Sequence, residues 1–392
     1  MFAHLRPQAD DPILVLMRAF QADPRPGKVD LGIGVWRDAE GRTPVFGAVK
    51  TAEERLWRTQ DTKSYVSFAG DPAFHAAVGD LLLGSVTRPR AATATTGGTS
   101  AVQTLLALSQ VARPAAQVWI PAETWPNHRV LAEHLGLATR AFTYLAPEGT
   151  GIDREALLRD LAQAQAGDVV ILHACCHNPT GIDPKPELQA EIVDSLARTG
   201  AVPLVDCAYL GFGAVPEADA AFLRRLASLP EAMLAFSGSK SFGLYRERVG
   251  LALVLLEQPG VVEAVQSQLT RLNRVNYSFP PDHGARVVTE ILADPALRAA
   301  WEAELAAIRT ALSANRQALA KALRARLQSD RFDGLAAQSG MFAMLPLGME
   351  RVTRMREDFA VYAVGTGRVN LAGVTPRTTD RVAEAIAAVL QD

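Results

Sequence analysis

Residues 168–209 read DVVILHACCHNPTGIDPKPELQAEIVDSLARTGAVPLVDCAY, and this segment is the most informative about the fold. It opens with an apolar run that ends at Cys175, continues through an amphipathic segment, 187–200, and closes with a second apolar run, 203–209. Short apolar runs bounded by turn residues are typical of buried strands, and a helix between two of them predicts parallel strands. We therefore expect an α/β fold in which helices cover both faces of a largely parallel sheet.

The same alternation continues on both sides of this stretch. Before it, we expect strands at 117–121 and near 139–145, and helices at 101–111, around 127–136 and at 153–165. After it, we expect strands at 233–237 and 249–256. The pattern then changes to a long helix, 297–327, a hairpin-like segment containing Gly340, a helix at 350–359, a strand at 368–371 and a closing helix. A smaller α+β unit should therefore follow the α/β body.

Bulk properties exclude several classes of protein. The chain has 392 residues, about right for two domains. Forty Lys and Arg against 42 Asp and Glu leave a net charge of −2, which gives no general affinity for nucleic acid or anionic membranes. Three cysteines, two of them adjacent, form no disulfide framework and indicate a reducing compartment. Because no signal peptide or long uncharged apolar stretch is present, we expect a cytoplasmic enzyme.

A lysine follows one of the expected strands in the segment Phe236-Ser-Gly-Ser-Lys-Ser-Phe-Gly243. A partly desolvated amine loses its proton more easily and can form a Schiff base with a carbonyl cofactor. Ser237, Ser239 and Arg248, eight residues after Lys240, suit a phosphate group. Alone, the segment is better explained by a solvated loop lysine, so it is a weak signal by itself.

Two glycine-containing segments bear on the cofactor. Gly97-Gly-Thr-Ser100 opens a helix, so its N–H groups and hydroxyls suit a phosphate, although a plain glycine turn with a Ser or Thr cap fits as well. Gly32-Ile-Gly34 resembles part of a dinucleotide fingerprint. Arg37 stands where the third glycine should be, which argues against a nicotinamide cofactor.

Polar side chains also follow the neighbouring strands. Asp206 ends an apolar strand, and a buried carboxylate needs a partner, for which a protonated pyridine nitrogen is suitable and a structural arginine is the alternative. Tyr209 lies three residues later. Trp125 is either a core aromatic or a lid on a flat ring. In His173-Ala-Cys-Cys-His-Asn-Pro-Thr-Gly181 the contiguous Cys-Cys-His lacks zinc spacing, so we expect no metal and place the Asn178 amide in the crevice.

Two arginines are candidates for carboxylate binding, which a guanidinium achieves in a bidentate fork that lysine cannot reproduce. Arg274 lies in Asn273-Arg-Val-Asn-Tyr-Ser-Phe279, and Arg368 lies in Thr366-Gly-Arg-Val-Asn370. A surface ion pair is the alternative for each.

Together these segments resemble one family. In chain order they are Gly32-Ile-Gly-Val35, Gly97-Gly-Thr99, Trp125-Pro-Asn-His128, His177-Asn-Pro-Thr-Gly181, Asp206-Cys-Ala-Tyr209, Ser237-Gly-Ser-Lys-Ser-Phe-Gly243, Arg246-Glu-Arg-Val-Gly250 and Gly367-Arg-Val-Asn370. Over essentially its whole length the chain resembles the aspartate and aromatic-amino-acid aminotransferases, subgroup I-alpha of the class I enzymes that use pyridoxal 5'-phosphate (PLP). One departure is Gly238, where Tyr, Cys or a similar residue is usual.

The resemblance implies a fold-type-I enzyme with a mainly parallel seven-stranded sheet. The large PLP-binding domain would span 43–308, the small C-terminal domain 309–392, and residues 1–42 would form an N-terminal arm and part of the small domain. A homodimer that shares its active sites between subunits is implied as well.

The resemblance also implies the role of each site residue. Those that would bind PLP are Gly98, Thr99, Trp125, Asn178, Asp206, Tyr209, Ser237, Ser239, Lys240 and Arg248, with Tyr65 of the neighbouring subunit. Among them Lys240, Asp206 and Tyr209 would be catalytic, and His128 would lie behind Asp206. Those that would bind substrate are Gly34, Trp125, Asn178 and Arg368, with Arg274 of the neighbouring subunit facing the distal end of the substrate.

The implied reaction is transamination between tyrosine, phenylalanine, tryptophan or aspartate and 2-oxoglutarate, a ping-pong reaction through pyridoxamine phosphate. Arg274 suits a distal carboxylate, whereas Phe279 and the small Ser64 suit a ring, so we expect dual use, with strict aspartate specificity as the alternative. A PLP-dependent β-lyase or decarboxylase would have less use for Arg274. A non-enzymatic regulator would need a DNA-binding domain, for which the 31 residues before Gly32 are too few.

Overall fold

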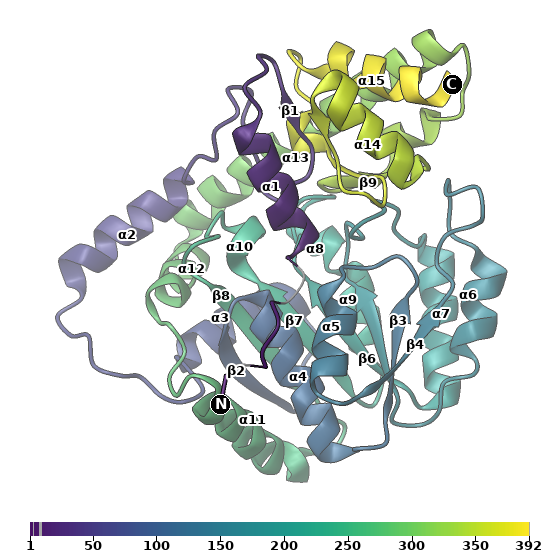
Figure 1. The fold of residues 1–392 in the computed structure, drawn as a ribbon. Helices are drawn as coiled ribbons and strands as arrows, with labels where there is room; N and C mark the ends of the chain where they lie inside the picture. Colours follow the sequence, from purple (N-terminus) through teal and green to yellow (C-terminus); the bar gives the residue numbers. More distant parts are fainter. Residues whose placement is uncertain (3, 8–9, 392) are drawn as a thin grey trace. The chain divides into compact units, whose positions relative to one another are not determined.

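The computed structural model describes residues 1–2, 4–7 and 10–391 (Figure 1). By its contacts the chain divides into two compact units. Unit 1 consists of Met1–Thr43 and Ala311–Asp392, and unit 2 consists of Pro44–Thr310. In the described part of the chain, no helix combines the length and the apolar character needed to cross a membrane.

Unit 2 contains a seven-stranded sheet with the strand order β2-β8-β7-β6-β5-β3-β4 (Figure 1). Its strands are β2 (Arg90–Thr96), β3 (Gln117–Pro121), β4 (Ala138–Phe142), β5 (Val169–His173), β6 (Val202–Cys207), β7 (Ala232–Ser237) and β8 (Val249–Leu255). Only β8 runs against its neighbours, pairing antiparallel with β2 and β7, while the other pairs are parallel. The predicted α/β fold with a mainly parallel seven-stranded sheet is therefore confirmed.

Helices surround this sheet. In chain order they are α2 (Gly47–Thr59), α3 (Pro72–Leu83), α4 (Gly98–Ala112), α5 (Asn127–His134), α6 (Arg154–Leu161), α7 (Pro186–Thr199), α8 (Pro216–Asp219), α9 (Ala221–Leu226), α10 (Gly238–Ser241), η1 (Pro259–Val261), α11 (Val262–Asn276) and α12 (His283–Ala293). The long α13 (Pro295–Leu327) begins in unit 2 and ends in unit 1. Helix ends follow the expected signals: Asp153 accepts a 2.9 Å hydrogen bond from the Ala156 N–H at the start of α6.

The core of unit 2 lies between α4, α11 and the sheet. Every residue of β5, β7 and β8 is buried, as expected for strands that are covered on both faces. Leu105 on α4, Ile171 on β5 and Leu269 on α11 belong to one apolar cluster and are fully enclosed. Because the packed layers fix the strand ends, they also fix the side chains that follow those ends.

Unit 1 is built from two small sheets and several helices. Its elements are α1 (Pro12–Ala22), β1 (Val29–Asp30), η2 (Asp333–Ala337), β9 (Phe342–Met344), α14 (Gly348–Phe359), β10 (Val361–Tyr362), β11 (Arg368–Asn370), η3 (Leu371–Gly373) and α15 (Thr379–Gln391). β1 pairs with β10 in parallel, and β9 pairs with β11 in antiparallel fashion. The prediction of a hairpin around Gly340 is wrong. β9 is followed by α14, and the strand that pairs with β9 is β11, farther along the chain.

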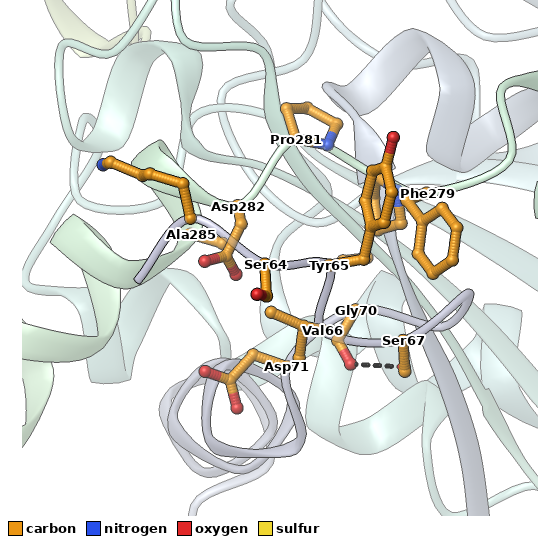
Figure 2. A pocket seen from close by; sticks show the side chains of 13 residues that line it. Ser64, Tyr65, Val66, Ser67, Gly70, Asp71, Phe279, Pro281, Asp282 and Ala285 are labelled. Atoms are coloured by element: carbon orange, nitrogen blue, oxygen red, sulfur yellow. Dashed lines mark hydrogen bonds between the residues drawn. The ribbon is translucent and has the colours of Figure 1, made fainter. Parts of the chain in front are cut away.

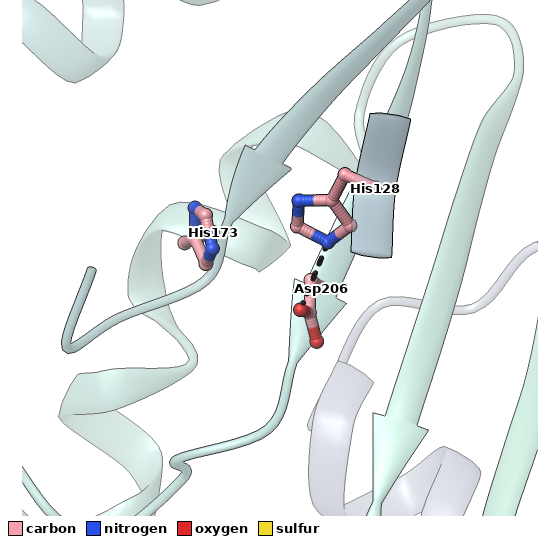
Figure 3. Close-up of side chains that lie close together, drawn as sticks. All are labelled: His128, His173 and Asp206. Carbon is pink, nitrogen blue, oxygen red and sulfur yellow. Dashed lines mark hydrogen bonds and ion pairs between the residues drawn. The ribbon is translucent and has the colours of Figure 1, made fainter. Parts of the chain in front are cut away.

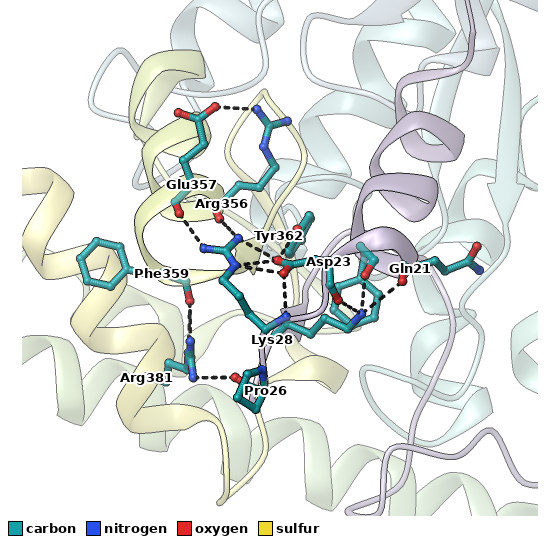
Figure 4. A network of polar contacts seen from close by, with 11 residues as sticks. Gln21, Asp23, Pro26, Lys28, Arg356, Glu357, Phe359, Tyr362 and Arg381 are labelled. Atoms are coloured by element: carbon teal, nitrogen blue, oxygen red, sulfur yellow. Dashed lines mark hydrogen bonds and ion pairs between the residues drawn. The ribbon is translucent and has the colours of Figure 1, made fainter.

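A polar network holds the N-terminal segment of unit 1 against the end of α14 (Figure 4). Arg25 hydrogen-bonds the Asp23 carboxylate and donates to the carbonyl oxygens of Arg356 and Glu357, at 2.8 and 2.6 Å. The Tyr362 hydroxyl donates to the same carboxylate at 2.7 Å. Arg25 thus adds hydrogen bonds to carbonyl groups in the last turn of α14, next to β10, which pairs with β1.

Candidate active site

The candidate residues of unit 2 gather at one edge of its sheet. Ser237 ends β7, and Asp206 and His173 lie opposite each other at the ends of β6 and β5. β8 lies between β2 and β7 and runs antiparallel to both, so β2 and β7 end at the same edge of the sheet. Thr96, at the end of β2, pairs with Val249 of β8, and Ser237, at the end of β7, pairs with Gly250 of β8. Ligands of open parallel sheets bind beyond the carboxyl ends of the strands, which is this edge.

The turn between β2 and α4 approaches the turn after β7 so closely that its glycines are required. A Cβ on Gly98 would lie 2.8 Å from the Ser237 Cβ. Gly97 has a φ of +85°, and a Cβ there would lie 2.4 Å from Nη2 of Arg248. Arg248 in turn donates a 3.2 Å hydrogen bond to the Ser239 hydroxyl. An arginine, two serine hydroxyls and the N-terminus of a helix are therefore brought together, a set of groups that suits a phosphate.

Thr99 follows in the first turn of α4, where it is half-buried. The first N–H groups of a helix have no partner within the helix. Thr99 thus adds a hydroxyl and an N–H group to the same set of donors.

Lys240 lies in the short helix that follows β7. Its amine is 5.0 Å from the ring centroid of Tyr209, which is 5% exposed. The positive charge of Lys240 is also among the influences that lower the pKa of Asp206. The structure therefore brings together the three residues that the sequence predicted to be catalytic.

Asp206 is held from behind by a buried histidine (Figure 3). Its Oδ2 is 3.2 Å from Nε2 of His128, and Nδ1 of His128 is 2.8 Å from the Thr124 hydroxyl. Burial by itself raises the pKa of Asp206, but the His128 hydrogen bond, the electrostatic influence of His128 and the positive charge of Lys240 bring it below its usual value. The carboxylate therefore stays ionised at neutral pH, ready to pair with a cation.

Two buried groups of side chains also have the composition of metal sites, with all ligand atoms of each group within 4.8 Å of one another. They are His128, His173 and Asp206, and Cys175, Cys176 and Asp219. In the first, both ring nitrogens of His128 are within hydrogen-bonding distance of Thr124 and Asp206. In the second, the Asp219 carboxylate accepts three backbone N–H bonds of 2.8 to 3.1 Å. We interpret both groups as hydrogen-bonded packing.

Asn178 and Trp125 complete the strand-end group. Asn178 is 6% exposed, and its Oδ1 has no hydrogen-bond partner among the residues that the structure describes. Buried polar atoms are nearly always paired, so this oxygen indicates that a polar group of a ligand binds beside it. Trp125 is half-buried and packs edge-on against His128, with the ring centroids 5.3 Å apart.

A row of rings behind Asp206 was missed by the sequence analysis. His128, His173, His177 and Tyr144 lie in succession, with centroid distances of 5.3, 4.3 and 3.9 Å. Burial and the neighbouring His128 lower the pKa of His173 to about 3, so this ring is neutral. The signal available in the sequence was a histidine at the end of an otherwise apolar strand next to that of Asp206.

Arg368 lies in unit 1 and is 6% exposed. Its Nη2 donates a 2.7 Å hydrogen bond to the Gly32 carbonyl oxygen, and its guanidinium lies 4.5 Å from the ring centroid of Phe342. Gly34 packs against the same ring, because a Cβ there would lie 3.3 Å from Cζ of Phe342. Arg368 and Gly34, both predicted to bind substrate, are therefore neighbours within unit 1.

Tyr65 and Arg274 belong to a second group in unit 2, which adjoins a pocket of about 200 Å³ (Figure 2). The Tyr65 side chain stacks on Phe279, with centroids 4.3 Å apart, and Phe279 stacks on Phe68 at 4.4 Å. The Arg274 guanidinium lies 5.5 Å from the ring centroid of Phe68. Within the described residues, neither Tyr65 nor Arg274 bonds to or stacks on Lys240 or Asp206.

Comparisons with known proteins identify the family. The family model for aminotransferase class I and II matches residues 26–386, and the chain belongs to this family. It is 45% identical to the aromatic-amino-acid aminotransferase of Paracoccus denitrificans, over 98% of this chain and 99% of that one. It is 42% identical to the aspartate aminotransferase of Escherichia coli (strain K12), over the full length of both.

A solved structure of an aromatic-amino-acid aminotransferase is also similar to this chain in fold and sequence. The aromatic-amino-acid aminotransferase from Burkholderia pseudomallei, described as covalently bound to pyridoxal phosphate, superimposes with a TM-score of 0.96. It is 38% identical in sequence, and the match covers 100% of this chain and 99% of that chain.

Proposed function

We propose that the protein is a PLP-dependent aminotransferase that takes amino groups from aromatic amino acids and aspartate and passes them to 2-oxoglutarate. The observation that carries this proposal is the placement of Lys240 beside the buried, ionised Asp206 at the edge of the sheet where the phosphate-binding groups gather. Family membership supports it, and so does the description of the Burkholderia relative as covalently bound to pyridoxal phosphate.

The residues at this edge fit PLP in both of its parts. The groups that would hold its phosphate are Gly98, Thr99, Ser237, Ser239 and Arg248. The groups that would hold its ring are Trp125, Asn178, Asp206 and Tyr209. The unpartnered Oδ1 of Asn178 supports this fit, because a ring bearing polar substituents would give it a partner.

The residues then have separate tasks in the reaction. When bound, PLP supplies a carbonyl carbon that takes the amino group and a pyridine ring that withdraws electrons from the substrate α-carbon. Asp206 holds a proton on the pyridine nitrogen, and His128 keeps Asp206 ionised and oriented. The Lys240 amine would remove the α-proton of the amino acid as a general base. Arg368 binds the α-carboxylate in a bidentate pair.

The active enzyme would be a homodimer that shares its active sites. Tyr65 is 80% exposed, and its hydroxyl would reach the PLP phosphate of the neighbouring subunit. Arg274 is also exposed and forms no ion pair with a described residue, so its guanidinium is available to a substrate of that subunit.

Dual substrate use follows from the surroundings of Arg274. Its charge suits the distal carboxylate of aspartate and 2-oxoglutarate, while the Phe68 ring beside it gives an apolar surface for an aromatic side chain. A guanidinium left buried and unpaired next to a ring would be costly, but the exposed Arg274 can turn toward water. Relatives named for aromatic amino acids and for aspartate have nearly equal identities, in agreement with this proposal.

The test is a set of kcat/KM values for aspartate, phenylalanine, tyrosine and leucine with 2-oxoglutarate as acceptor. We expect substantial values for the first three donors and a clearly lower value for leucine, which has neither a ring nor a distal carboxylate. Activity with aspartate and none with phenylalanine or tyrosine would instead support strict aspartate specificity.

A further inference from the structure

We propose that Phe279 is a positioning residue that holds Tyr65 and Arg274 together as one unit for the active site of the neighbouring subunit. This inference rests on the proposed function, in which those two side chains act across the dimer. In this proposal Phe279 acts through Tyr65 and Arg274 and does not itself contact the cofactor or the substrate.

The contact between Phe279 and Tyr65 comes first. The two rings are nearly parallel, 15° from coplanar, with centroids 4.3 Å apart (Figure 2). Tyr65 is 80% exposed, so little else restricts its side chain. An exposed side chain loses rotamer freedom when it is ordered, and a stacked ring offsets that loss by fixing one orientation in advance.

The same Phe279 ring reaches Arg274 through Phe68. Phe279 stacks on Phe68 with centroids 4.4 Å apart and planes 25° from parallel. The Arg274 guanidinium lies 5.5 Å from the Phe68 centroid, within the range of a cation–π contact. Phe279 therefore contacts Tyr65 directly and is connected to Arg274 through Phe68.

Hydrogen bonds that do not involve Phe279 hold the segments that carry Tyr65 and Arg274 in place. Asn273 is fully buried, and its amide donates to the carbonyl oxygens of Phe68 and Ala94, both at 2.9 Å. The Tyr277 hydroxyl donates to Oδ1 of Asn273 at 2.7 Å. These bonds attach the end of α11 and the segment before α3 to β2. Removing the Phe279 ring should therefore free the side chains of Tyr65 and Arg274 while the backbone stays in place.

Two functional losses should accompany Phe279→Ala. PLP affinity should fall because Tyr65 no longer points steadily at the phosphate, and kcat/KM for aspartate should fall by about tenfold because Arg274 is less well placed. The phenylalanine half-reaction should change less. Phe279→Tyr keeps the flat ring and should restore both properties, whereas Phe279→Leu keeps apolar volume only and should restore them in part.

Hybrid dimers show in which subunit Phe279 acts. The two chains of a hybrid carry different affinity tags, through which the hybrid is purified. One of the two chains carries Lys240→Ala, so that only one active site of the dimer can catalyse transamination. In the first hybrid Phe279→Ala is placed in the chain that keeps Lys240. In the second it is placed in the Lys240→Ala chain. The reference hybrid carries Lys240→Ala alone.

The first hybrid should match the reference, because its competent site receives Tyr65 and Arg274 from a chain with an intact Phe279. The second should show the full loss of aspartate kcat/KM and of PLP affinity at the competent site, measured from the PLP dependence of activity. Val275→Ala in the second arrangement is the control, since Val275 is 71% exposed and adjoins Arg274 in sequence. Equal losses in both hybrids, or no loss in either, would overturn the inference. A wild-type dimer without transaminase activity would refute the proposed function instead.

Discussion

Nε2 of His128, on α5, lies 3.2 Å from Oδ2 of Asp206, near the end of β6, and both side chains are buried. A buried carboxylate in contact with a single histidine still has acceptor capacity left. The pKa of Asp206 is below its usual value in spite of its burial, so the carboxylate is ionised and can accept a further hydrogen bond. This is the property that a partner for a protonated pyridine nitrogen needs.

Asp206→Ala should therefore lower kcat far more than it lowers PLP affinity. The variant still has the phosphate-binding residues, but no group holds the proton that makes the ring withdraw electrons. Kinetics measured with increasing PLP test this, with Asp206→Glu as the charge-retaining control. Complete recovery of the alanine variant by excess PLP would make Asp206 a binding residue only.

Arg274→Leu should separate the two kinds of donor. Loss of a charge-assisted pair worth about 3 kcal/mol should reduce kcat/KM for aspartate by roughly a hundredfold or more. The phenylalanine half-reaction, followed by single-turnover spectroscopy, should change far less. Arg271→Leu is the matched control, because Arg271 is exposed on the same helix one turn earlier. Equal losses for both donors would show that Arg274 is structural.

Complementation should reveal the shared site. Homodimers of a Lys240→Ala chain and homodimers of an Arg274→Ala chain should each transaminate dicarboxylates poorly, the first for want of the lysine and the second for want of the arginine. Mixed, they should regain activity, since the hybrid has one site with an intact lysine and an intact arginine from opposite chains. Light scattering on the wild type should give a dimer. A fully active monomer would contradict this arrangement.

His173 should make the stability of the protein pH-dependent. Its pKa is lowered from 6.5 to about 3, by burial first and by His128 second. Between these values the unfolded chain binds a proton that the folded chain does not, so stability falls as the pH drops below about 6.5. At pH 5 this amounts to about 2 kcal/mol relative to a histidine whose pKa is the same in the folded and the unfolded chain.

Urea unfolding at pH 7 and pH 5 measures this contribution. His173→Gln should lose less stability between the two pH values than the wild type, whereas His134→Gln, at an exposed position, should behave as the wild type does. If His173→Gln and His134→Gln show the same pH dependence, His173 is not held neutral by the fold.

Local sequence signals were sufficient for six strands of the sheet of unit 2, but β2 was not predicted from them. β3 begins and ends at the predicted residues, 117 and 121, and the mainly parallel order follows from helices that alternate with apolar strands. Asp206 and Lys240 were recognisable because polar residues at the ends of apolar strands are unusual. The roles of the individual site residues remain predictions.

Other features could not be read from the sequence because they depend on contacts between distant segments. β1 and β10 have two residues each, too short for any periodicity, and they pair only because the chain returns to that place. The stacking of Tyr144 on His177 likewise joins separate segments. The group formed by Tyr65, Phe279 and Arg274 combines residues from two loops and a helix end, none of which has a strong pattern of its own.

The most direct test of the central claim compares the wild type with Lys240→Ala in a coupled assay of aspartate or phenylalanine with 2-oxoglutarate. The wild type should form glutamate as fast as it consumes either donor. Lys240→Ala should fold and still bind PLP non-covalently, yet its turnover should fall by orders of magnitude, because both the covalent attachment and the base that moves the α-proton are lost. Turnover of Lys240→Ala near that of the wild type would contradict the account.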